Sequence, residues 1–299
     1  MIKVYKLTKE FEEYKALDNV SFEILDGCIY GLVGSNGSGK STLLRLLSGV
    51  YKAEEGNVSV DGFAVFNNPD VKSKFFYLPD TPYFFKNANL KEMAAFYEDM
   101  YAGFSRERFE HLTAVFPIST TKKIDNMSKG MQRQAALMLA LAVGPKYLLL
   151  DEAFDGLDPV MRNVLKNLLI DGIENYGMTA VIASHNLREL EDLCDHISLI
   201  HNGKLLFSDS LDDIKLKIHK VQAAFSAPLP EEALQDLKVL KSEKTGSLLQ
   251  MVVSGDEKEI MDKITSFNPV FAEIIEPTLE EIFIYEMEAK GYDVGNILG

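Results

Sequence analysis

The chain has 299 residues, of which 46% are hydrophobic and 25% are charged, and its 31 basic and 45 acidic side chains give a formal net charge of −14. These ordinary globular values exclude collagen-like, disordered and disulfide-scaffold proteins. The acidic balance argues against a nucleic-acid partner, because phosphate contacts need clustered Lys and Arg.

The first two thirds of the chain read as strands that alternate with helices. In chain order, strands are predicted over residues 1–7, 20–25, 28–33, 57–60, 75–78, 147–150 and 179–183. Helices are predicted over residues 40–48, 90–100, 106–115, 130–143 and 159–176. This interleaving indicates an α/β domain with a mostly parallel sheet.

A domain boundary is expected near Lys220. Beyond it, strands are predicted over residues 221–225, 248–253 and 270–275, and helices over 230–237, 256–267 and 278–288. Thr278 and Glu281 have capping-box spacing, which supports the start of the last helix. The pattern predicts a small C-terminal α+β domain, for which a ferredoxin-like arrangement is one candidate.

The cysteine content and the hydropathy indicate a protein that is made and kept inside the cell. Cys28 and Cys194 lie in apolar segments and are interpreted as reduced core thiols. No run approaches the roughly 20 apolar residues that a helix needs to cross a bilayer. Residues 1–13 carry charges throughout and lack the apolar block of a signal peptide.

A glycine-rich loop follows the strand at 28–33 and opens the helix at 40–48. Residues 34–41 read Gly-Ser-Asn-Gly-Ser-Gly-Lys-Ser, which fits the phosphate-binding pattern G-x-x-x-x-G-K-[ST]. Glycines let successive backbone N–H groups point at phosphate oxygens, and the helix N-terminus adds its positive dipole end. Lys40 is expected to reach the β- and γ-phosphates, and Ser41 to offer a hydroxyl to Mg²⁺. The predicted nucleotide-binding residues of this segment are Gly34, Ser35, Asn36, Gly37, Ser38, Gly39, Lys40, Ser41 and Thr42.

A second signal is the apolar strand at 147–150, which ends in Asp151 and Glu152. Asp151 would hold Mg²⁺ as a Walker-B aspartate. Glu152 would orient or deprotonate the attacking water, a general-base role worth typically 10²–10⁴-fold in rate. Because strand ends are often acidic, this pair alone is weak evidence for a catalytic site. It indicates a nucleotide site because a glycine-rich loop lies earlier in the same α/β chain.

The third signal lies before the helix at 130–143, where residues 127–131 read Met-Ser-Lys-Gly-Met. This segment resembles the signature sequence of ATP-binding cassette (ABC) ATPases, usually Leu-Ser-Gly-Gly-Gln, and the chain resembles that family over about residues 2–217. Phe11 stands where these proteins carry an aromatic that stacks on adenine. Residues 155–158 look like the D-loop, and Ser184-His185 looks like the switch histidine.

The resemblance implies a mechanism in which two cassettes close head-to-tail over two ATP molecules. Ser128 and Gly130 would contact the γ-phosphate of the ATP held by the other copy, and His185 would sense the loss of that phosphate. Hydrolysis would then change the relative stability of closed and open dimers. The implied small molecules are ATP and Mg²⁺, with Ser41, Asp151 and Asp80 as candidate metal residues.

Two departures from the family pattern stand out. Asp80 stands where the family usually places the Gln of its Q-loop, and it is either a Mg²⁺ or water ligand or a turn-forming residue between Pro79 and Pro82. Lys129 replaces the first glycine of the signature and is interpreted as facing solvent, with a charge contribution to the site as the alternative. Arg133 is interpreted as part of a surface or interface ion pair.

Aromatic residues gather between positions 75 and 116, which hold 12 of the 30 Phe and Tyr of the chain. This stretch matches the helical subdomain on which the membrane subunit of the family docks. The candidates for a groove that receives a partner helix are Tyr83, Phe84, Phe85, Tyr97, Tyr101 and Phe104. The alternative is that these rings fill the core of a small subdomain, and about half are expected to do so.

The resemblance implies a P-loop NTPase of ABC type, with an ABC ATPase domain over residues 1–219, a helical subdomain at about 81–143 and a small α+β domain over 220–299. The expected function is that of a Mg²⁺-dependent ATPase subunit of a membrane ABC transporter, peripheral on the inner face of the cell membrane. Its expected partners are a second ABC ATPase subunit, in a homodimer or heterodimer, and separate transmembrane permease subunits, but no nucleic acid. Residues 276–283 look like the C-terminal end of bacterial ABC-2-type exporter ATPases, which favours export.

Two alternatives belong to other classes. A soluble ABC ATPase that acts on ribosomes or DNA is disfavoured by the single cassette, the absence of a sustained heptad run and the acidic charge. A regulatory module that binds ATP without hydrolysis is disfavoured because both Glu152 and His185 are present.

Overall fold

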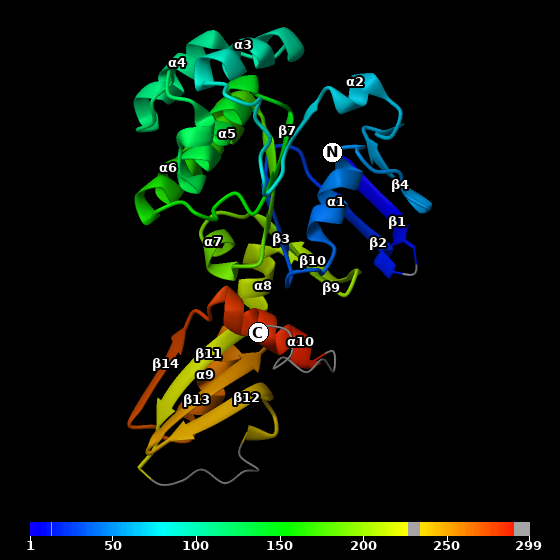
Figure 1. Cartoon of the computed structure of the whole chain (residues 1–299). Helices are drawn as coiled ribbons and strands as arrows, with labels where there is room; N and C mark the ends of the chain where they lie inside the picture. Colours follow the sequence, from blue (N-terminus) through cyan, green and yellow to red (C-terminus); the bar gives the residue numbers. More distant parts are fainter. Residues whose placement is uncertain (13, 227–233, 290–299) are drawn as a thin grey trace. The chain divides into compact units, whose positions relative to one another are not determined.

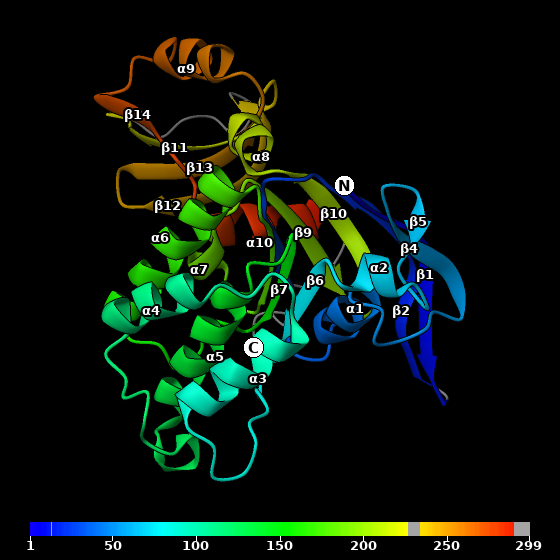
Figure 2. The same ribbon diagram turned by 90° about the horizontal axis from the view of Figure 1, so that it is seen from above.

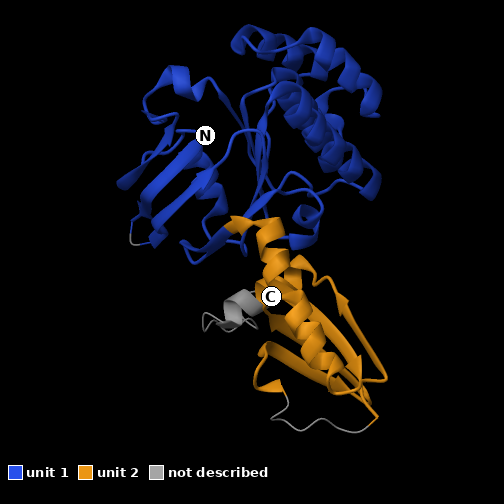
Figure 3. Ribbon diagram, turned by 180° about the vertical axis from the view of Figure 1, so that it is seen from behind, with its two compact units in different colours: residues 1–208 blue, residues 209–299 orange. Residues whose placement is uncertain are grey.

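The computed structural model describes residues 1–12, 14–226 and 234–289. The chain divides into two compact units, residues 1–208 and residues 209–299 (Figure 3). The domain boundary that was expected near Lys220 falls later than this division, within the first strand of the second unit's sheet.

A six-stranded sheet lies at the centre of unit 1 (Figure 1), and its strand order is β10-β9-β3-β8-β7-β6. Its strands are β3 (Ile29–Val33), β6 (Phe75–Leu78), β7 (Tyr147–Asp151), β8 (Thr179–Ser184), β9 (His196–His201) and β10 (Lys204–Ser210). β3 pairs in parallel with β8 and β9, and β7 pairs in parallel with β8 and β6. Every residue of β3, β7 and β8 is buried, which explains why their sequences are continuously apolar instead of alternating.

A second, antiparallel sheet of unit 1 has the order β2-β1-β4-β5. It contains β1 (Ile2–Phe11), β2 (Tyr14–Ile24), β4 (Glu55–Val60) and β5 (Phe63–Ala64). One apolar core joins this sheet to the helix α1 (Lys40–Leu47) and to one face of the parallel sheet, through side chains such as Leu7, Leu17, Leu43 and Leu149. The glycine-rich loop therefore lies between two buried elements, β3 and α1.

The remaining helices of unit 1 begin at side chains that cap them. They are α2 (Pro69–Lys72), α3 (Leu90–Met100), α4 (Arg106–Val115), α5 (Lys129–Val143), α6 (Pro159–Tyr176) and α7 (Leu187–Glu191), with a 3₁₀ turn at Ile124–Asn126. Asn89, Ser105, Ser128 and Asp158 each accept a hydrogen bond from the first turn of the helix that follows. Figures 1 and 2 show α3 to α6 on one side of the parallel sheet, and α1 with the antiparallel sheet on the other.

Unit 2 contains the helix α8 (Leu211–Lys217) and an antiparallel sheet of order β12-β13-β11-β14. Its other elements are β11 (Ile218–Ala224), β12 (Lys238–Thr245), β13 (Leu248–Ser254), α9 (Glu257–Thr265), β14 (Phe271–Ile275) and α10 (Leu279–Ala289). In order of appearance the strands lie 2-3-1-4, the order of the ferredoxin-like candidate. Of the helix expected over 230–237, the first half, residues 230–233, lies outside the described residues.

The capping box expected at the start of α10 is confirmed. The backbone N–H of Thr278 donates to the Glu281 carboxylate at 3.0 Å, and the N–H of Glu281 donates to Thr278 Oγ1 at 3.2 Å. Within the described part of the chain, no helix has the length and apolar character that crossing a bilayer requires.

Candidate functional site

The glycine-rich loop turns from the end of β3 into the first residue of α1. Gly37 and Gly39 have φ of 78° and 111°, which L side chains rarely adopt. A Cβ atom on Gly34 would lie 2.3 Å from the carbonyl oxygen of Ile200, and a Cβ on Gly39 would lie 2.6 Å from that of Ala16. Glycine is therefore required at positions 34 and 39 for the loop to pack against its neighbours.

The side chain of Lys40 lies inside this loop and is only 5% exposed. Its ammonium donates to the carbonyl oxygens of Gly34 at 2.7 Å and Ser35 at 3.2 Å. Burial lowers the pKa of Lys40, while the nearby charge of Glu152 opposes that shift. Ser38 Oγ is also buried and finds no hydrogen-bond partner among the described residues. A buried cation and an unpaired hydroxyl in one loop fit an anionic group such as a phosphate.

Asp151 ends β7 with its carboxylate buried. Ser41, in the first turn of α1, donates to Asp151 Oδ1 at 3.0 Å, and the hydroxyl of Tyr77 donates to Oδ2 at 3.1 Å. Burial, together with the charge of Asp151, raises the pKa of Tyr77, so this hydroxyl stays protonated and remains a donor. The oxygens of Ser41 and Asp151 are hard ligands side by side, which fits Mg²⁺. Sequence reasoning did not find Tyr77, which reaches the site from the adjacent strand β6.

Glu152 follows Asp151 in the left-handed backbone region, with φ of 50°. Its N–H donates to the carbonyl of Ala183 at 2.9 Å, which holds the residue there. Such strain costs about 1–3 kcal/mol for a non-glycine residue and concentrates at functional sites. The bend aims the carboxylate at Lys40 Nζ, which lies 3.5 Å from Oε1.

His185 lies at the end of β8, opposite Glu152. Its ring atom Nδ1 lies 2.9 Å from Glu152 Oε2, and its backbone N–H donates to the same oxygen at 3.3 Å. Asp155 lies close to both residues. One side-chain oxygen or ring nitrogen from each of Glu152, Asp155 and His185 lies within 4.8 Å of the other two, a spacing at which the three could hold a metal ion. The structure thus brings together the two residues that the sequence predicted as catalytic.

The segment resembling the ABC signature lies at the N-terminus of α5. Ser128 caps the helix, accepts a hydrogen bond from Met131 N–H at 3.3 Å and is exposed. A Cβ on Gly130 would lie 2.6 Å from the carbonyl oxygen of Gly156, so the signature and the loop after β7 pack closely within one chain. Lys129 is exposed.

Phe11 lies at the end of β1 and is 40% exposed. Its ring meets that of Tyr51 edge to face at 5.5 Å, and the ammonium of Lys9 lies 5.0 Å from its centre. Its partner across the hairpin is Tyr14, whose hydroxyl donates to the carbonyl oxygen of Gly37 at 3.1 Å. Tyr14 therefore ties the hairpin to the glycine-rich loop, and sequence reasoning missed it.

Asp80, the residue at the Q-loop position, forms an ion pair with Arg133 of α5, with 2.8 Å between Oδ1 and Nη2. Arg133 therefore forms an ion pair, as the sequence predicted. It is only 7% exposed, however, so the prediction that it lies on the surface of the helix is wrong. The sequence carries no local signal for this contact, because 53 positions separate the two residues.

The aromatic-rich stretch divides between core and surface. Phe75, Phe76, Phe109 and Phe116 are buried. The exposed rings are Tyr83, Phe85 and Phe96, which contact one another in that order. The other rings expected in the groove, those of Phe84, Tyr97, Tyr101 and Phe104, are half-buried.

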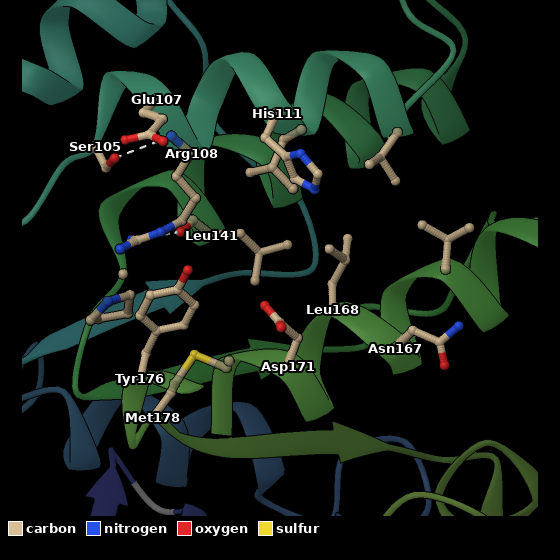
Figure 4. Close-up of a pocket in the computed structure, with 16 residues that line it drawn as sticks. Ser105, Glu107, Arg108, His111, Leu141, Asn167, Leu168, Asp171, Tyr176 and Met178 are labelled. Carbon is tan, nitrogen blue, oxygen red and sulfur yellow. Dashed lines mark hydrogen bonds between the residues drawn. The ribbon is translucent and has the colours of Figure 1, made fainter. Parts of the chain in front are cut away.

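A separate hollow of about 830 Å³ lies between α4, the end of α5 and α6 (Figure 4). The guanidinium of Arg108 lies 4.8 Å from the ring centre of Tyr176 and donates to the carbonyl oxygens of Leu141 and Ala142. None of the described residues that line this hollow was predicted from the sequence as a site residue. It is therefore distinct from the cluster around the glycine-rich loop.

The parallel sheet, the glycine-rich loop and the acidic end of β7 define a P-loop NTPase. Family and structure comparisons narrow this class. A family model described as ABC transporter matches residues 17–155. An uncharacterised ABC transporter ATP-binding protein of Methanocaldococcus jannaschii is 31% identical over 227 residues, which cover 74% of this chain and 82% of that protein.

Two further comparisons agree with this family. The ABC transporter ATP-binding protein YtrB of Bacillus subtilis is 29% identical over 97% of this chain and 99% of its own length. A solved ATP-binding subunit of an ABC transporter, 26% identical, superposes with a TM-score of 0.66 over 72% of this chain and 92% of that chain. The chain belongs to the ABC transporter ATP-binding family, and its general activity is ATP hydrolysis.

Proposed function

We propose that this chain is the ATPase subunit of a membrane exporter and that Glu152 is its catalytic base. The observation that carries the proposal is the convergence of Lys40, Glu152 and His185 beside the glycine-rich loop. Lys40 begins α1, and Glu152 and His185 directly follow β7 and β8. The three residues meet at the carboxyl ends of the parallel strands, where such sheets bind ligands.

The nucleotide site is assigned to residues 34–42 with Phe11 at the adenine end. The buried Lys40 ammonium and the unpaired Ser38 hydroxyl support a triphosphate in the loop. Ser41 and Asp151 would hold Mg²⁺, which, when bound, offsets the negative charge that the phosphate oxygens carry. Tyr77 keeps the Asp151 carboxylate oriented toward Ser41.

In the chemical step, the Glu152 carboxylate accepts the proton of the attacking water. His185 holds that carboxylate through both its ring and its backbone N–H, so the base is oriented before the water arrives. General-base catalysis of this kind contributes typically 10²–10⁴-fold. Lys40 Nζ lies 3.5 Å from the other carboxylate oxygen, and its ammonium would turn to the phosphates once they enter the loop.

The site is completed by a second copy or a related subunit. Ser128 is exposed at the N-terminus of a 15-residue helix, where an anion is stabilised by free N–H groups and by the helix dipole. The Ser128 hydroxyl and the Gly130 N–H of one subunit would contact the γ-phosphate that the other subunit holds.

The partner that moves cargo is a separate transmembrane subunit. The exposed rings of Tyr83, Phe85 and Phe96 support a docking surface on the segment between β6 and α5. Export is supported by the resemblance of residues 276–283 to exporter ATPases. A role in transport is supported by similarity to the bacitracin transport ATP-binding protein BcrA of Bacillus licheniformis, 29% identical over 74% of this chain and 73% of that protein. Such a subunit works at the inner face of the cell membrane.

The experiment is steady-state phosphate release by the wild-type chain, by Lys40→Ala and by a surface control, Lys91→Ala. We expect Lys40→Ala to lose measurable turnover, because Lys40 is the buried cation of the loop, and Lys91→Ala to retain it. Unchanged hydrolysis in Lys40→Ala would remove Lys40 from the site. Nucleotide binding without phosphate release, even beside the membrane subunit, would favour a regulatory binding module.

A further inference from the structure

The guanidinium of Arg133 lies at the point where two core strands end. Its Nη2 donates to Asp80 Oδ1 at 2.8 Å, and its Nη1 donates to the carbonyl oxygens of Pro79 at 3.3 Å and Asp151 at 3.5 Å. β6 and β7 pair in parallel, with Leu78 opposite Leu150. Arg133 therefore bonds to the residues that follow β6 and to the last residue of β7.

Because Arg133 is buried, losing its contact with Asp80 costs more free energy than losing a surface ion pair does. Arg133 is only 7% exposed, whereas the Asp80 side chain is 59% exposed. A desolvated guanidinium needs a carboxylate or several carbonyl oxygens, and removing its charged partner leaves a buried charge under-compensated. The buried arginine thus depends on the orientation of Asp80, and the segment at residues 79–80 is held in turn by Arg133.

Arg133 is also close to the functional end of its helix. It follows Ser128 by five residues, which is about 7.5 Å along the axis at 1.5 Å per residue. A tether at Arg133 therefore constrains the direction in which the N-terminus of α5 points. That N-terminus carries the exposed Ser128 and the Gly130 N–H.

We propose that Arg133 and Asp80 form a positioning pair that orients the N-terminus of α5 for contact with nucleotide held by a second subunit. The inference rests on the proposed function of Ser128. In this proposal, Asp80 acts through Arg133 and not as a metal ligand. The residue at the position of the family's Q-loop Gln thus helps to orient the N-terminus of α5.

The test uses Asp80→Asn, Arg133→Gln and the double variant, each made in the Glu152→Gln chain, which we expect to bind ATP without hydrolysing it. Glu98→Gln is the matched control, because it breaks an exposed ion pair with Arg106 elsewhere in the same helical segment. Two quantities are measured: the affinity of the monomer for a fluorescent ADP, and the concentration dependence of ATP-induced dimer formation by light scattering.

We expect all variants to bind ADP as the parent does, because the glycine-rich loop is unchanged. Dimer formation should weaken about tenfold in Asp80→Asn and in Arg133→Gln, within the usual range of coupling between sites. The double variant should be no weaker than either single variant, because the same interaction is lost. Glu98→Gln should match the parent. Additive losses, or unchanged dimer formation, would overturn the proposal.

A Mg²⁺ titration of nucleotide binding separates the two roles of Asp80. If Asp80→Asn needs more Mg²⁺ while Arg133→Gln does not, Asp80 acts on the metal and the proposal is wrong. Amide hydrogen exchange in the monomer is the second readout. Asp80→Asn should speed exchange in the first two turns of α5 but not in α6, and unchanged exchange there would contradict the pair's role. This readout stands even if the Glu152→Gln parent fails to dimerise, which would instead count against the proposed function.

Discussion

His185 holds Glu152 by two contacts to one oxygen: its ring Nδ1 lies 2.9 Å from Oε2, and its backbone N–H donates to that atom at 3.3 Å. The other oxygen, Oε1, lies 3.5 Å from Lys40 Nζ. Glu152 itself is fixed in the left-handed backbone region. A carboxylate constrained from the backbone and from both oxygens is already positioned before substrate binds.

Replacing Glu152 by Gln should separate ATP binding from hydrolysis. The amide has nearly the same shape but cannot accept the proton of the attacking water, so phosphate release should fall about 10²-fold or more. The intact loop should still bind ATP and trap a closed dimer, which light scattering detects as a doubled mass. Glu152→Gln combined with Lys40→Ala should stay monomeric. A Glu152→Gln chain that remains monomeric with saturating ATP would count against a shared site.

Replacing His185 by Ala should slow hydrolysis without removing ATP. The variant keeps the backbone N–H contact to Glu152 but loses the ring, so we expect kcat to fall about tenfold to hundredfold with little change in KM. His111→Ala is the control, because His111 lines the separate hollow between α4 and α6. Equal effects of the two substitutions would remove His185 from the chemical step.

How far the sequence predicts the fold depends on whether an element carries its own end signals. The strand at Phe75–Leu78 and the helices at Leu90–Met100, Arg106–Val115 and Pro159–Tyr176 were predicted to the residue. The three helices follow Asn89, Ser105 and Asp158, whose side chains cap them. β12 was not predicted, because its charged and largely exposed residues have no alternating pattern.

The residues of the candidate site also divide into those that belong to a local sequence motif and those that do not. The glycine-rich loop and the Asp151-Glu152 pair are local motifs, so the sequence alone predicted them. Tyr77 and Arg133 reach the site only because β6, β7 and α5 pack side by side, and no spacing along the chain encodes that contact. Tyr14 was missed for a related reason, since the β1–β2 pairing brings it beside Phe11 and its hydroxyl to the loop.

The two cysteines should react slowly in the folded chain. Burial raises the pKa of Cys28 to about 11, with smaller contributions from Asp195 and Asp26, and burial also raises the pKa of Cys194. At pH 8 the thiolate fraction of Cys28 is then roughly a hundredfold lower than at its ordinary pKa. Alkylation of Cys28 should speed up about tenfold per pH unit between pH 8 and pH 10.

Mass spectrometry of the alkylated native chain measures these rates, and the urea-unfolded chain serves as the control. Both thiols should react quickly once the chain unfolds, because neither pKa is then raised by burial. Rapid labelling of either cysteine in the native chain at pH 8 would show that the thiol is not enclosed as the structure has it.

The most direct test of the central claim is a mixing experiment with two inactive variants, Lys40→Ala and Ser128→Arg. If each nucleotide is held by the loop of one copy and the signature of the other, a mixed dimer has both defects in one site and none in the other. Random mixing then leaves about a quarter of all sites intact, and phosphate release should recover to about that fraction of the wild-type rate if the sites act independently. A mixture that hydrolyses no faster than the two variants measured apart would contradict the shared site.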